Sequence, residues 1–436
     1  MFFLYLLFSL SQASYSSSLL QCQSLTLVES IPDGVTFPSS SIANPSTTSV
    51  LNKLINITTI SLDIAQFYFS LRADPPPGDG SDFDGRDLWR RLQLWGNNGS
   101  SLRIVHNVPN QLFPDNDSED LAKSSERVKL RYLDFTKLIG RGIIHTKLWI
   151  GDNKHFYLGS ANTDWRSLRQ VKEMGLFGIN CPAIGKDLQK MFDIYWYLSD
   201  NPVPTHFPSH LDTEYNMNNP MKLVVKEDNS DMDIFLVSSP PPFCTKSRTN
   251  DIDGLLNVLN SALQFIYIEV MDYFPAIIYS YPEQYWPVID DALRRAVFDR
   301  GVEVRLLVSP MPHNLTRSDE YNYLASLAAL DGSGKHGQLR CAVKLFVVPS
   351  YTPEQEKLKY ARVNHAKFVV TDKHAYLSTS NWSGDYFTST GGISSVMRCY
   401  TSRRGVCQGL LDVFNRDWNS HYTKPLKPWG ESNYVV

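Results

Sequence analysis

The stretch "HTKLWIGDNKHFYLGSAN", residues His145–Asn162, decides the fold, because it returns in the second half as "HAKFVVTDKHAYLSTSN", residues His365–Asn381. Each copy has a histidine, a lysine two residues later, then an aspartate, and ends in a small polar turn with an asparagine. Since side chains alternate along a β-strand, the histidine and the lysine of each copy share one face. A single copy is compatible with a histidine satisfied inside a core, whereas two copies in matching contexts favour a shared chemical role.

Other segments repeat around these two copies, in the same order. "VLNKLINITTISLDIAQFYF" (Val50–Phe69) resembles "LLNVLNSALQFIYIEVMDYF" (Leu255–Phe274), and each is typical of a helix followed by an apolar strand. Two further strands then precede each copy, and a helix with a tryptophan, Trp196 or Trp418, ends each half. A period this long indicates two similar lobes rather than a solenoid, whose repeats have about 20–50 residues.

We therefore predict an α/β protein with two similar α/β lobes, related by a pseudo-twofold axis, each a mixed sheet flanked by helices. The first lobe is expected over residues 22–198 and the second over residues 244–436. Prolines cluster in residues 199–243, which predicts the connection between the lobes.

Length and composition fit this organisation. The chain has 436 residues, of which 42% are hydrophobic and 20% charged, as in globular proteins. The formal net charge is −3, so a polyanion would have to bind in a local groove rather than on a broadly basic surface.

The first residues, "MFFLYLLFSLSQAS", predict a signal peptide over residues 1–13. The apolar run is shorter than the roughly 20 residues of a membrane span, and nothing downstream resembles one. A clipped signal anchor and a misassigned gene start are the alternatives. N-glycosylation sequons at four asparagines also favour the secretory route: Asn56, Asn98, Asn116 and Asn314. A fifth match, Asn381-Trp-Ser, lies inside the second motif and is expected to be unmodified.

Six cysteines are present and none forms a C-x-x-C pair, which argues against a zinc site. Disulfides are permitted in an oxidising compartment, but spacing alone does not give their pairing.

The repeated residue types suit phosphoryl transfer without a metal or another cofactor. Lysine and asparagine side chains can neutralise the oxygens of a phosphodiester, and one set from each lobe can surround one phosphate. One imidazole can attack phosphorus, and the other can protonate the leaving oxygen and then activate water. An acidic working pH follows, because the acid must be protonated and histidine has a reference pKa of about 6.5.

The pattern H-x-K-x4-D followed by G-S-x-N resembles the phospholipase D superfamily. Four stretches are similar to the animal branch that contains phospholipase D family members three and four: "LVESIPDGVTFPSSSIANPSTT", "LGSANTDWRSLRQVKEMG", "YWPVIDDALRRAVFDRGVEVRLLVS" and "STSNWSGDYF". This resemblance covers nearly the whole chain from Cys22. It implies a metal-independent phosphohistidine mechanism, a glycosylated lysosomal 5′→3′ exonuclease of single-stranded DNA and RNA, a homodimer, and a disulfide between Cys22 and Cys181.

The resemblance also implies roles for individual residues. Glu173 matches the glutamate that orients a histidine, which we expect to be His145, so His145 is favoured as the nucleophile and His365 as the general acid and base. The stretch "STGGISS" after the second copy has no carboxylate, so a backbone carbonyl or a hydroxyl would have to orient His365. The predicted catalytic set is His145, Lys147, Asp152, Asn162, Glu173, His365, Lys367, Asp372 and Asn381.

Substrate contacts are predicted for the polar turns and for aromatic residues near the motifs, on which bases can stack. The candidates are Ser160, Thr379, Tyr68, Tyr273, Trp165 and Trp382. Two alternatives to a nuclease stay open at this point. One keeps the chemistry but acts on a phospholipid headgroup, and the other is a non-catalytic binding protein, against which the two complete motifs argue.

Overall fold

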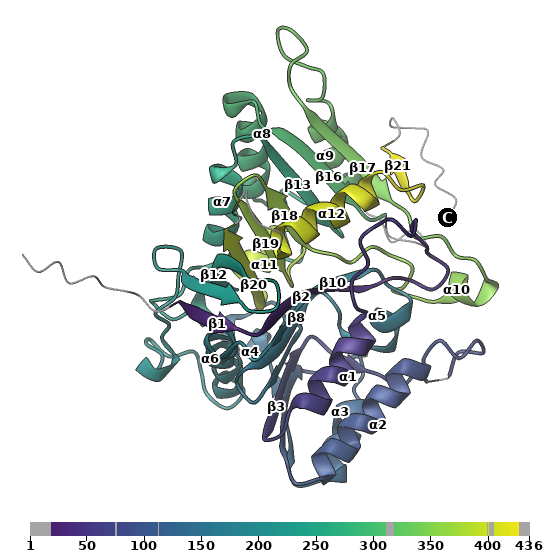
Figure 1. Cartoon of the computed structure of the whole chain (residues 1–436), viewed down its shortest axis with the longest axis vertical. Coiled ribbons are helices and arrows are strands. Elements are labelled where there is room, and N and C mark those ends of the chain that lie inside the picture. The colour runs from purple at the N-terminus through teal and green to yellow at the C-terminus, as the bar shows by residue number, and fades with distance from the viewer. Residues whose placement is uncertain are drawn as a thin grey trace, which may run out of the picture.

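The computed structural model describes residues 19–74, 76–111, 113–310, 318–398, 400 and 405–426. The predicted leader, residues 1–13, and the sequon at Asn314 lie outside these described residues. Two sheets dominate the described part of the chain, one in the lower lobe and one in the upper lobe of Figure 1.

The first sheet has the strand order β2-β10-β8-β7-β3-β5-β6. Strands β3, β5 and β6 are parallel, whereas all other neighbours are antiparallel, so the sheet is mixed. The strands are β2 (Ser24–Ser30), β3 (Ser61–Gln66), β5 (Ser101–Asn107), β6 (Val128–Leu133), β7 (Leu148–Gly151), β8 (His155–Gly159) and β10 (Glu173–Ile179).

The second sheet repeats this order strand for strand as β12-β20-β19-β18-β13-β16-β17, again with the last three parallel. These strands are β12 (Ser230–Ser239), β13 (Phe265–Val270), β16 (Glu303–Val308), β17 (Cys341–Phe346), β18 (Phe368–Thr371), β19 (His374–Ser378) and β20 (Gly392–Arg398). Its edges are extended by β1 (Leu20–Cys22), β11 (Met221–Val225) and β21 (Thr423–Pro425). The predicted α/β fold with two similar lobes is confirmed.

Helices cover both faces of each sheet. The outer faces carry α1 (Thr47–Ile57), α2 (Phe83–Asn97) and α3 (Asp117–Ser124) in the first lobe, and α7 (Asp251–Ser261), α8 (Val288–Arg300) and α9 (Ser318–Ala328) in the second. The inner faces carry α6 (Pro182–Leu198) and α12 (Val406–Trp418). Short elements complete the loops: α4 (Phe135–Ile139), α5 (Trp165–Arg169), α10 (Pro353–Lys357), α11 (Gly384–Thr388), β4 (Phe69–Ser70), β9 (Thr163–Asp164), β14 (Ala276–Ile277) and β15 (Gln284–Tyr285).

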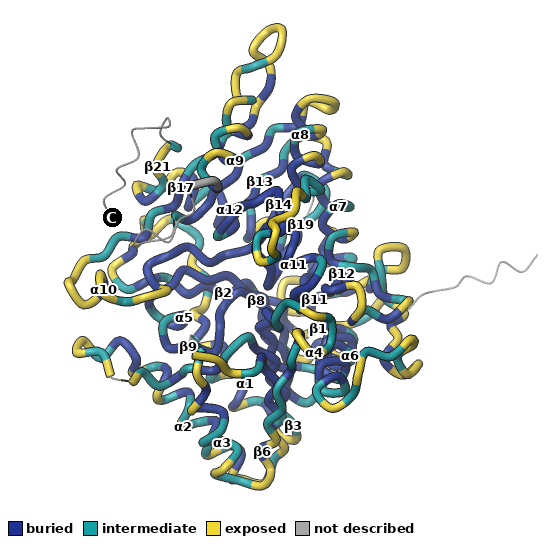
Figure 2. Tube along the Cα trace, turned by 180° about the vertical axis from the view of Figure 1, so that it is seen from behind, coloured by how far each residue is buried: buried dark blue, intermediate teal, exposed yellow. Residues whose placement is uncertain are grey.

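The inner helices α6 and α12 join the two lobes through one shared core. In α12, Leu410, Phe414 and Trp418 recur at intervals of four residues, so they lie on one face of the helix. They pack in the same hydrophobic cluster as Leu188 and Phe192 of α6. Buried segments therefore fill the middle of the molecule from one lobe to the other, as the dark blue parts of the trace in Figure 2 show.

The segment 199–243, predicted as the connection, does more than join the lobes. After an irregular stretch it supplies β11 and β12 to the second sheet, and β12 lies directly against β20. The strand β1 also pairs with β11, although it precedes the first lobe in sequence. Composition alone could not show this, because the prolines surround these strands rather than fill them.

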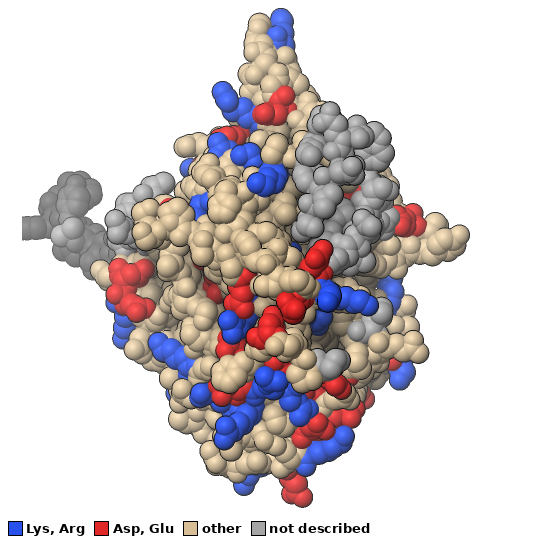
Figure 3. Space-filling view, turned by 90° about the vertical axis from the view of Figure 1, so that its right-hand side faces the viewer, with Lys and Arg blue, Asp and Glu red and all other residues tan. Residues whose placement is uncertain are grey.

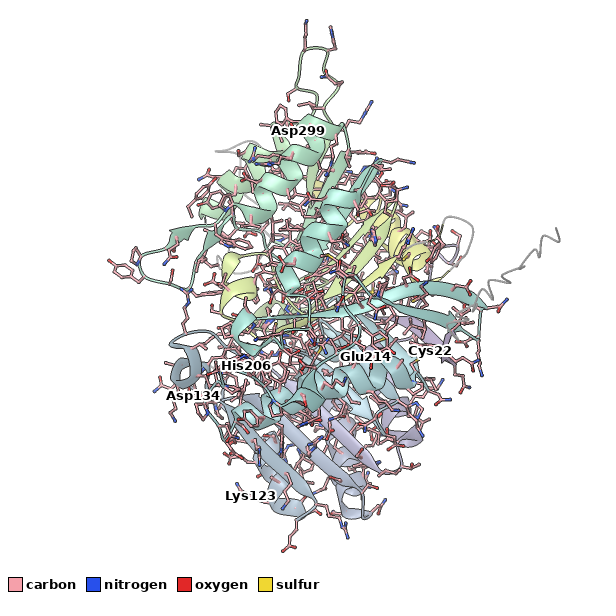
Figure 4. The ribbon with its side chains drawn as sticks, turned by 90° about the vertical axis from the view of Figure 1, so that its left-hand side faces the viewer. Cys22, Lys123, Asp134, His206, Glu214 and Asp299 are labelled. Atoms are coloured by element: carbon pink, nitrogen blue, oxygen red, sulfur yellow. A yellow bond between two sulfur atoms is a disulfide. The ribbon has the colours of Figure 1, made fainter. Side chains whose placement is uncertain are left out.

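The disulfide between Cys22 and Cys181 is present, as predicted. It links the end of β1 to the residue before α6. Figure 4 shows Cys22 at the waist of the molecule, between the lobe tips marked by Lys123 and Asp299. The sequon residues Asn56, Asn98 and Asn116 are exposed, and their glycosylation stays a prediction. None of the helices in the described ranges has the length and apolar character that a bilayer crossing needs.

Candidate active site

The two motif copies meet where the lobes touch. The backbone N–H of His145 donates to the carbonyl of Gly391 at 2.7 Å, and that of His365 donates to the carbonyl of Lys172 at 2.7 Å. Each histidine is therefore held by the main chain of the opposite lobe. The two imidazole rings lie 6.4 Å apart between centroids, at an angle of 73°. This separation leaves room for one phosphoryl group between the rings.

A second pair of contacts, again crossing between lobes, sets the orientation of the rings. Nδ1 of His145 lies 2.8 Å from the carbonyl oxygen of Thr379, and Nδ1 of His365 lies 2.8 Å from a carboxylate oxygen of Glu173. A carbonyl oxygen only accepts, so Nδ1 of His145 carries the proton and Nε2 keeps its lone pair. The expectation that Glu173 orients His145 is wrong. Glu173 begins β10, which reaches across the lobe boundary to His365.

Gly392 occupies the position in the second lobe that Glu173 occupies in the first. Glu173 begins β10 and Gly392 begins β20, and the two strands pair in the same register with β8 and β19. A Cβ atom at Gly392 would lie 2.3 Å from Oγ of Ser380, so no side chain fits there without rearrangement. Close packing thus explains why His145 is oriented by a carbonyl oxygen and not by a carboxylate.

The motif lysines and asparagines line the same site. Nζ of Lys147 donates to the carbonyl of His145 at 2.6 Å, and Nζ of Lys367 donates to that of His365 at 2.7 Å. Each ammonium keeps further protons for a ligand, because it has three. The side-chain oxygens of Asn162 and Asn381 are buried without a hydrogen-bond partner. The two ammonium groups and the two amide groups therefore gather polar atoms around the histidines.

Burial and the two lysines control the charge of the histidines. Burial, followed by the charges of Lys147 and Lys367, holds the pKa of His145 well below its ordinary value. Burial also lowers the pKa of His365 to about 4, but Glu173 opposes this and Lys367 adds to it. His145 is therefore the more readily neutral imidazole, and His365 is the more readily protonated one.

The lysines themselves are short of negative partners. Burial and then repulsion from Lys367 lower the pKa of Lys147, and burial lowers the pKa of Lys367 to about 7, against the attraction of Glu173. A bound phosphodiester would place negative charge beside both ammonium groups and raise their pKa values. The electrostatics of the site thus favour an anionic ligand.

Asp152 and Asp372 do not reach the site, contrary to their predicted catalytic role. Asp152 accepts from the backbone N–H groups of residues 59, 60 and 61, and Asp372 accepts from those of residues 263 and 264. Each aspartate follows the strand at whose other end the histidine and lysine lie. Asp152 therefore stabilises the loop before β3, and Asp372 stabilises the loop before β13, so both have a structural function.

Ser160 and Thr379 lie behind the histidines rather than on the substrate side. Ser160 is fully buried and donates to Glu173 at 2.5 Å. The hydroxyl of Thr379 is also fully buried and accepts from the N–H of Ile393 at 3.0 Å. Both contact other protein groups, so the prediction that they contact the substrate is wrong. They support the residues that position the histidines.

The predicted aromatic contacts divide into two groups. Tyr273 and Trp382 belong to the core of the second lobe, are 1% and 2% exposed, and cannot stack on a base. Trp165 is also buried. Tyr68 is half-buried, and its hydroxyl accepts from Asn162 at 3.4 Å. Of these four aromatic residues, only Tyr68 stays a candidate.

The structure brings three further aromatic residues to the site, of which sequence reasoning missed Phe67 and Phe113. The ring of Phe67 lies 5.5 Å from that of His145, and Phe113 stacks on Tyr68 at 4.9 Å. Tyr386, with its ring 5.1 Å from His145, accepts from Asn381 at 3.1 Å. Phe67 could have been found from its place beside Tyr68, whereas the loop residue Phe113 carries no signal in sequence.

Comparisons with known proteins agree with this geometry. Residues 39–351 match the family described as "PLD3/4, PLD-like domain". The protein named 5'-3' exonuclease PLD3 from Macaca fascicularis is 42% identical over 409 residues, which cover 93% of this chain and 81% of that protein. This chain belongs to the PLD3/4 branch of the phospholipase D superfamily.

Two further similarities give the breadth of this family and its fold. Phospholipase D Z from Dictyostelium discoideum is 39% identical over 414 residues, which cover 92% of this chain and 91% of that protein. The crystal structure of phosphatidylserine synthase from Haemophilus influenzae Rd KW20 superposes with a TM-score of 0.57 at 11% identity, over 93% of this chain and 88% of that one. At that identity the likeness concerns the fold alone.

Proposed function

We propose that this protein is a metal-independent 5′→3′ exonuclease of single-stranded DNA and RNA that works through a phosphohistidine intermediate in an acidic compartment. The observation that carries the proposal is the pair of buried histidines, 6.4 Å apart, each beside its own lysine. The 42% identity to proteins named 5'-3' exonuclease PLD3 supports a nucleic-acid substrate and the direction of cleavage.

In this proposal each histidine has its own role. Nε2 of His145 attacks phosphorus as the P–O bond to the leaving nucleotide breaks, and Nε2 of His365 gives its proton to that oxygen. Water then attacks phosphorus, His365 takes a proton from the water, and the P–N bond breaks. Lys147 and Lys367 neutralise the phosphoryl oxygens throughout. His145 is chosen as the nucleophile because it is the neutral imidazole, a different reason from the expected contact with Glu173.

Substrate binding follows from the aromatic residues beside His145. Phe67, Tyr68 and Phe113 form an aromatic cluster, in which Phe67 and Phe113 lie 4.8 Å apart. Stacking on such rings contributes roughly 1–3 kcal/mol per base and accepts any sequence. Figure 3 shows basic and acidic side chains mixed over one face of the molecule, so we assign strand binding to this cluster and the buried lysines rather than to a basic surface.

By similarity to the family, we also propose that the protein is located in the lysosome or is secreted. We further propose that it is N-glycosylated and forms a homodimer. An acidic compartment suits an enzyme whose general acid is a histidine of lowered pKa. A phospholipid is the second candidate substrate, favoured by the similarity to a protein named Phospholipase D Z.

A matched assay tests the proposal. Wild type and a His145→Ala/His365→Ala double variant are incubated at pH 5.5, with EDTA, on a 5′-hydroxyl single strand, a 5′-phosphate single strand, a duplex and phosphatidylcholine vesicles. We expect wild type to release mononucleotides from a single strand and the double variant to release none. Release of a headgroup with intact single strands would replace the nuclease by a phospholipase, and wild-type inactivity on every substrate would leave a non-catalytic protein.

A further inference from the structure

A chain of buried charges lies directly behind His365. Nζ of Lys172 lies 2.7 Å from a carboxylate oxygen of Glu269 and 2.8 Å from one of Asp417, and all three side chains are fully buried. Arg416 continues the chain, with contacts of 2.9 Å to Asp417 and 2.5 Å to Glu29. Lys172 immediately precedes β10, and the others come from β13, α12 and β2, so the buried charges span both lobes.

Residues next to Glu173 and His365 in the sequence belong to this ionic chain or contact it. Lys172 immediately precedes Glu173, and Asn364 immediately precedes His365. Nδ2 of Asn364 donates at 2.8 Å to the same oxygen of Glu269 that Lys172 contacts. The backbones of residues 172 and 364 also pair with each other as a parallel bridge. Glu269 therefore contacts both the segment that carries Glu173 and the segment that carries His365.

The equivalent place behind His145 holds no charge. Gly391 replaces Lys172 in the bridge to the histidine segment, and Ile144 replaces Asn364. Ala65 replaces Glu269, because each lies opposite the residue three places after the histidine. Tyr195, which precedes Trp196 as Asp417 precedes Trp418, contacts Oγ1 of Thr146 at 2.9 Å. The residues equivalent to Lys172, Glu269 and Asp417 are thus uncharged, although Arg248 and Asp187 form an ion pair farther along α6.

A structural role alone does not account for this difference. Buried ion pairs are often no more stabilising than apolar side chains of similar size, because removing two charges from water is costly. The uncharged half shows that an apolar solution exists within the same frame. A buried lysine between two carboxylates does, however, fix the position of the peptide that carries it, because each contact is short and directional.

We propose that Lys172 is a positioning residue for catalysis: its ammonium, clamped between Glu269 and Asp417, fixes Glu173 against His365. The inference rests on the proposed function, in which His365 is the general acid. Charged or titratable groups surround His365 on every side. Glu173, Lys147, Lys367 and His145 face its ring, and Lys172, Glu269 and Asp417 lie behind its main chain.

The test compares Lys172→Met with Arg248→Met. Arg248 and Asp187 form another buried pair between the lobes, at 2.8 Å, with no contact to either histidine, so its loss reports the cost of breaking such a pair. We expect both variants to have a lower Tm. Only Lys172→Met should lower kcat on a single strand at pH 5.5, by about 10- to 100-fold with KM unchanged, because small displacements of a proton donor are costly.

The pH profile supplies a readout that stability does not move. If Lys172→Met frees Glu173 from its position, His365 loses the carboxylate that raises its pKa, so the fall of kcat at high pH should move to lower pH in Lys172→Met. Glu269→Gln weakens the contact that holds Lys172 and should move the fall of kcat in the same direction, and this variant tests the inference if Lys172→Met fails to fold. Unchanged kcat and pH profiles in these variants would overturn the inference, whereas wild type without activity would overturn the proposed function instead.

Discussion

His145 and His365 occupy equivalent positions in two lobes of the same topology, yet their surroundings differ in charge. His145 donates to the carbonyl of Thr379 and is backed by uncharged residues. His365 contacts the carboxylate of Glu173 and is backed by a buried ionic chain. The difference shows how duplication can divide one task. The frame supplies two imidazoles at a fixed distance, and the residues around them decide which one takes up a proton more readily.

The largest effect that tests this division is the loss of either histidine. His145→Ala and His365→Ala should each lower turnover of a single strand by at least about 10³-fold. On bis(p-nitrophenyl) phosphate, whose leaving group needs no proton, His365→Ala should still give a burst of one equivalent of nitrophenolate, and His145→Ala should give none. Rapid-mixing absorbance and acid-quench labelling measure the burst and the phosphoenzyme. A burst in His145→Ala with a phosphate on His365 would exchange the two roles.

A smaller effect is expected from Glu173→Gln. The carboxylate raises the pKa of His365, which is about 4 in the empty site, so its loss should lower that pKa further. The fall of kcat with rising pH should then begin at lower pH, with a loss of about 10-fold or more at pH 5.5. In wild type the fall of kcat should lie at higher pH than that of kcat/KM, because the bound phosphodiester raises the pKa.

Steady-state profiles between pH 4 and pH 8 measure both shifts. Asp187→Asn is the matched control, since it also removes a buried carboxylate that contacts a cation, but away from the histidines. The same profile in Glu173→Gln and wild type would show that the contact with His365 does not set its charge.

The smallest effect on activity is expected at the motif aspartates. Asp152→Ala and Asp372→Ala should lower the free energy of unfolding by about 1–3 kcal/mol, because backbone N–H groups lose hydrogen bonds to a charged acceptor. Asp152 should cost more, since it accepts from three backbone N–H groups and Asp372 from two. Urea unfolding measures the difference, and kcat should stay at the wild-type value. A large loss of kcat without a loss of stability would return these residues to the catalytic set.

The stabilising effect of Asp152 should persist in an acidic compartment. Burial raises its pKa, but the backbone amides outweigh burial and hold the pKa below the ordinary value. A carboxylate with a lowered pKa stabilises the fold above its unfolded-state pKa, and the effect is lost only as the pH falls through the lower, folded-state value. The cost of Asp152→Ala should therefore be similar at pH 5.5 and at pH 7.

The sequence by itself determined the α/β class, the two lobes and the pairing of His145 with Lys147 and of His365 with Lys367, because these depend on local periodicity and on a repeated pattern. The disulfide between Cys22 and Cys181 came from the resemblance to a family, and the structure contains it. The strands β11 and β12 of the inter-lobe segment 199–243 were missed, because the prolines of this segment outweigh its short apolar runs.

Only the tertiary structure decided which partner each histidine has. Glu173 lies 28 residues after His145 in the chain, yet it orients His365, because the side chain of this first residue of β10 projects across the lobe boundary. Chain proximity is a guide to partners within one sheet but not to partners across an interface. The crowding at Gly392 and the ions behind His365 are likewise properties of packed neighbours, which no single segment of sequence contains.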